Sequence, residues 1–226
     1  MELPGGPLAT RPLHFIFVTD CSGSMSGSKI QSLNNAIRDA LPEMRDVARS
    51  NPNARVLVRS LKFSAGAQWH VPQETDIDQF QWSDLQAGGQ TDMGRAMHML
   101  ADAMKTPPMP DRALPPVLVL LTDGQPTDDF NSGLNALMSQ GWGKKAVRIA
   151  IAIGEDADLD VLQRFIGHQE IKPLVAHNAS ELVKYIRWAS TAVLKAASAP
   201  SSQSKQATTN VPLPPPPPLG SANDVW

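Results

Sequence analysis

Uninterrupted apolar stretches recur along the chain, and each ends at a polar or glycine-containing segment. Nearly every side chain in such a stretch is apolar, which is typical of strands buried on both faces of a sheet. The stretches that we expect to form strands are residues 13–19, 54–64, 115–123, 146–154 and 172–177. A weaker strand, residues 67–73, follows the second through a tight hairpin, and its proline suits an edge position.

Between these strands, apolar residues recur at intervals of three and four, which is the period of an amphipathic helix. We expect helices in residues 28–50, 91–105, 131–140, 158–166 and 180–197. Pro42 should kink or restart the first of these helices, because proline lacks the backbone N–H of a helix interior. Ser180 is the expected N-cap of the last helix.

Strands that alternate with helices predict βαβ units. The predicted fold is therefore α/β, with a doubly wound, mostly parallel central sheet, helices on both faces and an antiparallel edge strand. We expect a flexible N-terminal arm in residues 1–12, one folded domain in residues 13–197, and a Ser/Thr-rich linker with a proline-rich tail in residues 198–226. In such sheets ligands bind beyond the carboxyl ends of the strands.

Composition and charge argue against several classes of protein. The net charge is -2, and no Lys/Arg-rich run suggests nucleic acid as a partner. Cys21 is the only cysteine, so no intrachain disulfide forms and no Cys/His set matches a zinc site. The sequence shows neither a secretory signal nor a membrane-spanning apolar stretch, so we expect a soluble cytoplasmic protein.

The first predicted strand runs directly into a cluster of oxygen-bearing side chains, in FIFVTDCSGSMSG at residues 15–27. Asp20, Ser22 and Ser24 alternate there, and alternate side chains of an extended turn point the same way. Carboxylate and hydroxyl oxygens suit Mg²⁺ or Mn²⁺, which prefer six oxygen ligands. One motif cannot supply six, so other loops should contribute.

Two further loops carry suitable side chains. AGGQTDMG (residues 87–94) contains Thr91 after a Gly-Gly turn, and LLTDGQPTD (residues 120–128) ends a buried strand at Asp123. Parallel strands end at the same edge of a sheet, so these loops should meet the first one. The predicted metal ligands are Asp20, Ser22, Ser24, Thr91 and Asp123.

The motifs D-x-S-x-S as DCSGS, G-G-x-T-x-x-G as GGQTDMG and T-D-G in LLTDGQP occur in that order. This order resembles a von Willebrand factor type A domain with its metal-ion-dependent adhesion site, over about residues 13–195. The resemblance implies that the two serines bind the metal directly, and that Thr91 and the aspartates bind it directly or through water.

A narrower likeness concerns the phrases SGSMSG, FSAGAQ and LTDGQPTDD and the proline-run tail. They resemble the bacterial tellurite-resistance (TerY-like) group. Its members are small cytoplasmic proteins whose genes typically lie beside those of a protein kinase and a PP2C-type phosphatase. The resemblance implies these two enzymes as partners, in bacterial stress signalling.

These features predict a non-catalytic binding and scaffold module. Mg²⁺ or Mn²⁺, with Ca²⁺ less suited, would stay positively charged among neutral hydroxyls and keep a coordination position for a partner's Asp or Glu. Two alternatives remain open: a metal-dependent phosphohydrolase and a metal-independent structural subunit. The hydrolase motif G-x-S-x-G and a P-loop are absent, and no lysine sits in the three loops.

Neighbouring residues receive structural roles. We expect Cys21 to be a small neighbour of the site, and Asp92, Asp128 and Asp129 to cap helices, with support of the metal ligands as the alternative. The proline run at 214–218 is either a spacer or a docking segment for an aromatic-lined groove.

Overall fold

A single sheet of six strands, in the order β3-β2-β1-β4-β5-β6, forms the centre of the computed structural model, which describes residues 10–199 and 212–218. Neighbouring strands pair in parallel, except for the antiparallel hairpin of β2 and β3 at one edge. The predicted α/β fold is confirmed. The strands are β1 (Arg11–Asp20), β2 (Ala54–Ser64), β3 (Gly66–Asp76), β4 (Val117–Thr122), β5 (Val147–Ile153) and β6 (Leu174–Ala176).

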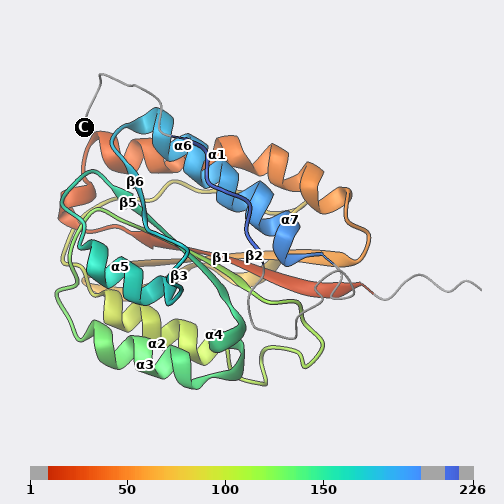
Figure 1. The fold of residues 1–226 in the computed structure, drawn as a ribbon. Helices are drawn as coiled ribbons and strands as arrows, with labels where there is room; N and C mark the ends of the chain where they lie inside the picture. The colour runs from red at the N-terminus through yellow and green to blue at the C-terminus, as the bar shows by residue number, and fades with distance from the viewer. Residues whose placement is uncertain (1–9, 200–211, 219–226) are drawn as a thin grey trace, which may run out of the picture.

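Helices cover both faces of this sheet (Figure 1). Helices α1, α6 and α7 lie on one face, and α2, α3, α4 and α5 lie on the other. The helices are α1 (Ser28–Arg49), α2 (Met93–Ala103), α3 (Phe130–Ser139), α4 (Gly141–Lys145), α5 (Leu159–Ile166), α6 (Ala179–Trp188) and α7 (Leu194–Ala197). A π-helical segment, Ala189–Val193, joins α6 to α7. Among the residues described, no helix is both long and apolar enough to cross a bilayer.

Strand β1 explains why the sequence pattern is continuous rather than alternating. Phe15 and Phe17 belong to the core under α1 and α6, whereas Ile16 and Val18 belong to the core under α2 and α3. Successive side chains of a strand point to opposite faces, and here both faces are covered by helices. A strand in this position must therefore be apolar at nearly every residue.

Two local expectations need correction. Of the two effects expected of Pro42, a restart does not occur: helix α1 continues through Pro42 as one helix, because the neighbouring Leu41 and Met44 are packed in the core, which holds the helix together despite one missing hydrogen bond. The N-cap of α6 is Asn178 rather than Ser180, since the Asn178 side chain accepts a hydrogen bond of 3.0 Å from the Glu181 amide.

The topology places the expected site at one edge of the sheet. Thr19 of β1 pairs with Leu121 of β4, so the two strands end side by side. Asp20 is the last residue of β1, and Asp123 directly follows β4. Both carboxylates are fully buried at this edge.

Candidate metal centre

Asp20 is held in place by two donors from the chain. Its Oδ1 accepts a hydrogen bond of 2.7 Å from the Ser22 amide, and its Oδ2 accepts one from the Thr122 hydroxyl. Burial raises the pKa of Asp20 above its ordinary value, since it disfavours the charged form, and the nearby Asp123 charge adds to this effect. Among the residues described, no basic side chain forms an ion pair with Asp20.

The side-chain oxygens of Ser22, Ser24 and Asp123 are linked by hydrogen bonds next to Asp20. The hydroxyls of Ser22 and Ser24 are 3.0 Å apart, and the Ser24 hydroxyl donates to Asp123 Oδ1 at 2.7 Å. A short 3-10 turn, Gly23–Met25, brings Ser24 back toward β4. Ser24 of the first loop and Asp123 of the third loop are thus in contact, although they are 99 positions apart in the sequence.

Thr91 completes this group from the second loop. Its Oγ1 and the Oγ of Ser24 each lie 3.8 Å from the point where a side chain on Gly124 would begin, so both hydroxyls flank the same small space. The Thr91 amide donates a hydrogen bond of 3.0 Å to the Thr127 hydroxyl. The structure therefore brings all five predicted residues together at this edge of the sheet.

The Gly88-Gly89 pair clamps the second loop to the first. The Gly88 amide donates to the Cys21 carbonyl at 2.8 Å, and the Gly23 amide donates to the Gly89 carbonyl at 3.0 Å. Gly89 has φ 91°, which favours glycine, and a Cβ there would lie 3.0 Å from the Ala65 amide nitrogen. These bonds fix the position of Thr91 relative to the serines.

The three aspartates at the rim differ from one another. Asp129 caps α3 by accepting a bond from the Ser132 amide, as expected. Asp128 accepts from the amides of Gly94 and Arg95 in the first turn of α2, so it caps a helix other than its own. Asp92 makes no side-chain cap and instead accepts from the Gly66 amide, tying the second loop to the β2–β3 hairpin.

Lys29 is a member of the site that the sequence analysis missed. Its Nζ lies 2.7 Å from Asp123 Oδ2, and its side chain is 15% exposed. No lysine sits in the three loops themselves, but Lys29 reaches Asp123 from the first turn of α1. The spacing of Lys29 just after SGSMSG was the available signal, but its partner is 94 positions away.

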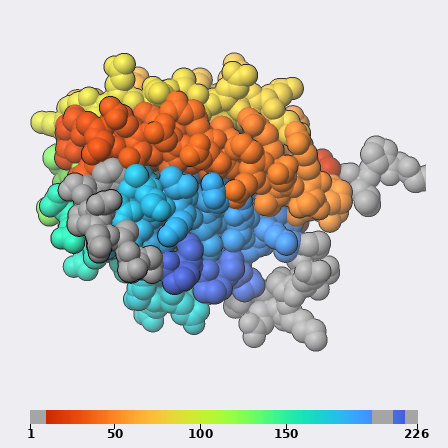
Figure 2. All heavy atoms as spheres, turned by 90° about the horizontal axis from the view of Figure 1, so that it is seen from above, coloured from red at the N-terminus to blue at the C-terminus, as the bar shows by residue number. Residues whose placement is uncertain are grey.

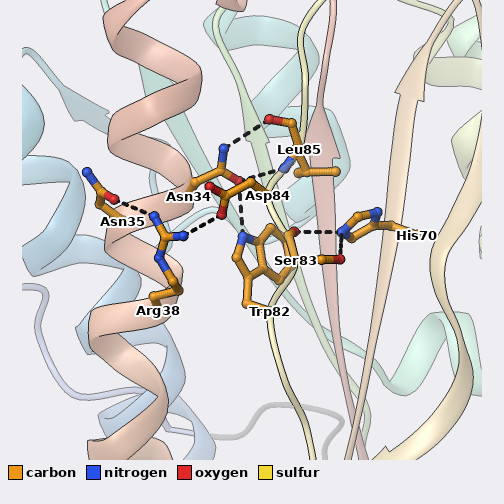
Figure 3. A network of polar contacts seen from close by, with 8 residues as sticks. All are labelled: Asn34, Asn35, Arg38, His70, Trp82, Ser83, Asp84 and Leu85. Atoms are coloured by element: carbon orange, nitrogen blue, oxygen red, sulfur yellow. Dashed lines mark hydrogen bonds and ion pairs between the residues drawn. The ribbon is translucent and has the colours of Figure 1, made fainter.

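A buried polar network fixes the long connection between β3 and α2 (Figure 3). The side chain of Asn34 on α1 donates to the Leu85 carbonyl, and its Oδ1 accepts bonds from the Leu85 amide and from Trp82 Nε1 at 2.9 and 3.0 Å. His70 on β3 bonds the Ser83 carbonyl at 2.8 Å. Hydrogen bonds to α1 and to β3 therefore fix this connection in the residues that precede Thr91.

Cys21, which directly follows Asp20 in the chain, is buried and chemically unreactive. Burial, and secondarily the Asp20 charge, raises the pKa of its thiol to about 12. The thiol therefore stays protonated near neutral pH, and a thiol is a poor nucleophile compared with a thiolate.

The sequence that contains the site matches the model of a known protein family. Residues 15–125 match the family model of the von Willebrand factor type A domain. This chain contains a von Willebrand factor type A domain. No curated protein is significantly similar to the chain in sequence.

Solved structures share the fold of this type A domain. They include a von Willebrand factor type A protein from Catenulispora acidiphila, with 18% identity, TM-score 0.61, and coverage of 81% of this chain and 43% of that one. The ArnB paralog VWA2 from Sulfolobus acidocaldarius has 18% identity, TM-score 0.56, and coverage of 78% and 44%. Proximal thread matrix protein 1 from the mussel byssus, with a zinc-occupied MIDAS motif, has 19% identity, TM-score 0.59, and coverage of 81% and 46%. This chain spans less than half the length of each of these relatives.

The donor set of this type A domain suits a hard cation. Within residues 10–199 and 212–218, no three His, Cys, Asp or Glu side chains form a group that could hold a metal ion. The candidate centre instead gathers two carboxylates with three hydroxyls, all oxygen donors. Asp20, a buried carboxylate that lacks a basic partner in the described chain, is the kind of group that a nearby cation would stabilise.

Proposed function

We propose that this type A domain is a non-catalytic, metal-dependent protein-binding module. Asp20, Ser22, Ser24, Thr91 and Asp123 would hold Mg²⁺ or Mn²⁺, with Ca²⁺ less suited because it takes more ligands. The observation that carries the proposal is the contact of the Ser22, Ser24 and Asp123 oxygens in front of the buried Asp20. Type A domains are usually non-catalytic binding modules, which agrees with this assignment.

The bound cation would supply positive charge and a coordination position for an Asp or Glu of a partner protein. The chain's own residues prepare that position. The Ser22 amide and the Thr122 hydroxyl keep Asp20 oriented, so its charge is available without rotation. The serine hydroxyls add oxygen ligands without adding negative charge, so the site would stay attractive to a carboxylate.

The substitution Asp20→Asn tests the metal site. It keeps the size of the side chain and removes its charge, so the stability of the metal-free chain should be unchanged or higher. The native chain should gain about 2.7 kcal/mol in Mg²⁺ or Mn²⁺ at 100 times the dissociation constant, and the variant should lose that gain. Urea unfolding with EDTA, Mg²⁺ or Mn²⁺ measures both quantities.

Asp39→Asn is the matched control, because Asp39 is an exposed aspartate of α1 outside the candidate metal centre. It should keep the full stabilisation by metal. Equal stabilisation of the native chain and Asp20→Asn would show that any bound ion sits elsewhere, which overturns the site.

The contact of Lys29 with Asp123 supports a second candidate function. An ammonium beside an aspartate and a hard cation could bind a phosphate group, so a metal-dependent phosphohydrolase remains the alternative. Turnover of p-nitrophenyl phosphate with Mg²⁺ or Mn²⁺, abolished by Asp20→Asn, would support the enzyme. Absence of turnover in a chain that is stabilised by the metal supports the binding module.

The partners are proposed from sequence likeness alone. Similarity to the bacterial tellurite-resistance group suggests a scaffold in cytoplasmic stress signalling, with a protein kinase and a PP2C-type phosphatase as partners. Co-purification from native cells, with and without chelator, tests this proposal. Partners that stay bound in EDTA and to Asp20→Asn would indicate the metal-independent structural subunit instead.

A further inference from the structure

A second candidate binding site lies beside β6, the last strand of the sheet, where the chain's own proline-rich segment rests on the domain. Residues 212–218 run along α6 (Figure 1), and Figure 2 shows their atoms against those of α6 on the molecular surface. Leu213 packs against the core that also contains Leu182 and Ile186 of α6.

Burial of the prolines in this segment recurs at an interval of three. Pro214 and Pro217 are half-buried, as is Leu213, whereas Pro212, Pro215, Pro216 and Pro218 are exposed. A polyproline II helix has three residues per turn, so every third side chain lies on the same face. The pattern indicates that one face of the segment is bound and the other faces solvent.

The surface beneath the segment is an apolar groove. A pocket of about 600 Å³ is lined by Leu159, Leu174, Val175 and Tyr185 of the domain and by Pro216–Pro218 of the segment. Leu159, the first residue of α5, is 47% exposed, and it is the one large hydrophobic residue that is exposed in the described part of the chain. Glu155 Oε1 and His177 Nδ1, which are 3.6 Å apart, also line this pocket.

Such a groove suits a proline-rich ligand. Proline segments are already extended and stiff, so they lose little entropy on binding, and they pack well against aromatic and aliphatic side chains. Trp188 lies one turn beyond Tyr185 on α6, and its buried Nε1 has no acceptor among the described residues. Strand β6 is also the last strand of the sheet, with only β5 beside it, and edge strands are commonly covered.

We propose that the groove formed by the start of α5, β6 and α6 is a binding site for proline-rich segments, and that residues 212–218 of the same chain are its resident ligand. The connection is long enough for this arrangement. From residue 199 to residue 212 there are 13 residue steps, which reach at most about 45 Å. To lie along α6, the chain must return past residues 179–197, which are about 28 Å long at about 1.5 Å per residue. This length is less than the reach of the connection.

The intramolecular arrangement has a thermodynamic advantage over a partner in solution. A segment tethered by a short connection has an effective concentration of about 1 mM or more. The resident segment should therefore mask the groove, and a foreign proline-rich peptide should bind only when the segment is weakened. Only a partner segment that displaces residues 212–218 would then bind to the groove.

The test uses the full-length chain with the double substitution Pro214→Ala and Pro217→Ala, which alters the bound face. Its matched control is Pro212→Ala with Pro215→Ala, which removes as many prolines at the same spacing from the exposed face. In ¹⁵N–¹H spectra, the amides of Leu174, Val175, His177 and Tyr185 should shift in the first variant and stay in place in the control.

A synthetic peptide with the sequence of residues 209–220 then probes the released groove. It should bind the Pro214/Pro217 variant at least about tenfold more tightly than it binds the native chain, and it should return the shifted amides toward their native positions. Leu159→Ser, a surface change on the groove side, should weaken that binding.

Identical spectra for the native chain and both variants would overturn the docking. Equal effects of the two double substitutions would overturn the assignment of a bound face. Native spectra that change with protein concentration, together with dimers in sedimentation, would assign the ligand to a second copy and overturn the intramolecular arrangement.

Discussion

The two aspartates of the candidate metal centre differ in their charged neighbours. Asp123 has a cationic neighbour in Lys29, at 2.7 Å, whereas Asp20 has only hydrogen-bond donors around it. A mostly buried ammonium in contact with a proposed metal ligand acts as a competing cation. Lys29 would therefore hold Asp123 in place without metal and lower the affinity for metal.

We expect Lys29→Met to raise the affinity for Mg²⁺ by about tenfold, or about 1.4 kcal/mol, because the ion no longer displaces an ammonium. Calorimetric titration with Mg²⁺ measures the change. Lys144→Met, which alters an exposed lysine on α4, is the control and should leave the affinity as it is. A lower affinity in Lys29→Met would mean that the lysine supports the metal ligands rather than competing for them.

At the scale of elements, the connection between β3 and α2 depends on one buried amide. Asn34 satisfies the Trp82 indole N–H, the Leu85 amide and the Leu85 carbonyl together (Figure 3). Asn34→Ala leaves these groups buried without partners, which should lower the free energy of unfolding by about 1–3 kcal/mol. Urea unfolding measures the loss.

Asn35→Ala is the control for this prediction. Asn35 is the next residue on α1, is exposed, and contacts only Arg38 in the same network. Its replacement should change stability by less than about 0.5 kcal/mol. Similar losses for the two variants would show that the buried amide has no special role.

Helices α2 and α3 approach each other through a pair of glycines. A Cβ on Gly133 would lie 2.2 Å from the Gly94 carbonyl oxygen, and one on Gly94 would lie 2.4 Å from the Asp129 carbonyl oxygen. Gly133→Ala must therefore push the helices apart and should cost about 1–3 kcal/mol of stability. Gly141→Ala, where a Cβ would meet nothing within 4 Å, should cost nothing in the same unfolding experiment.

At the scale of the whole molecule, a buried histidine of the inner strand β1 links stability to pH. Burial lowers the pKa of His14, Glu74 at 3.5 Å opposes this shift, and Arg59 adds to it. The unfolded chain therefore binds more protons than the folded chain as the pH falls below about 6.5, so stability decreases on acidification.

The change His14→Leu should reduce the slope of the free energy of unfolding against pH between about pH 5 and pH 7, whatever its effect on absolute stability. His98→Gln, at an exposed histidine of α2, should leave the pH dependence in place. Chemical unfolding at a series of pH values provides the slopes. An unchanged slope in His14→Leu would contradict the assignment.

The local sequence determined most of the fold because its signals are periodic. Strand β2 and the hairpin to β3 lie where the apolar run and the Ser64-Ala65-Gly66 turn predicted them, and the motif residues lie at the predicted strand ends. Burial on one or both faces of an element leaves a pattern that can be recognised without the partner. The strand ends then follow from chain direction, which is why Asp20 and Asp123 could be assigned to one edge.

Only the tertiary structure decided which side chains meet across long separations. The contacts of Lys29 with Asp123, of Asn34 with Leu85 and of Gly94 with Gly133 each depend on how two elements pack, and neither residue alone signals its partner. The same holds for residues 212–218, whose composition predicts a stiff segment but not the surface that receives it. Periodicity reports which face of an element is buried, whereas the identity of the covering element depends on the packing of the whole chain.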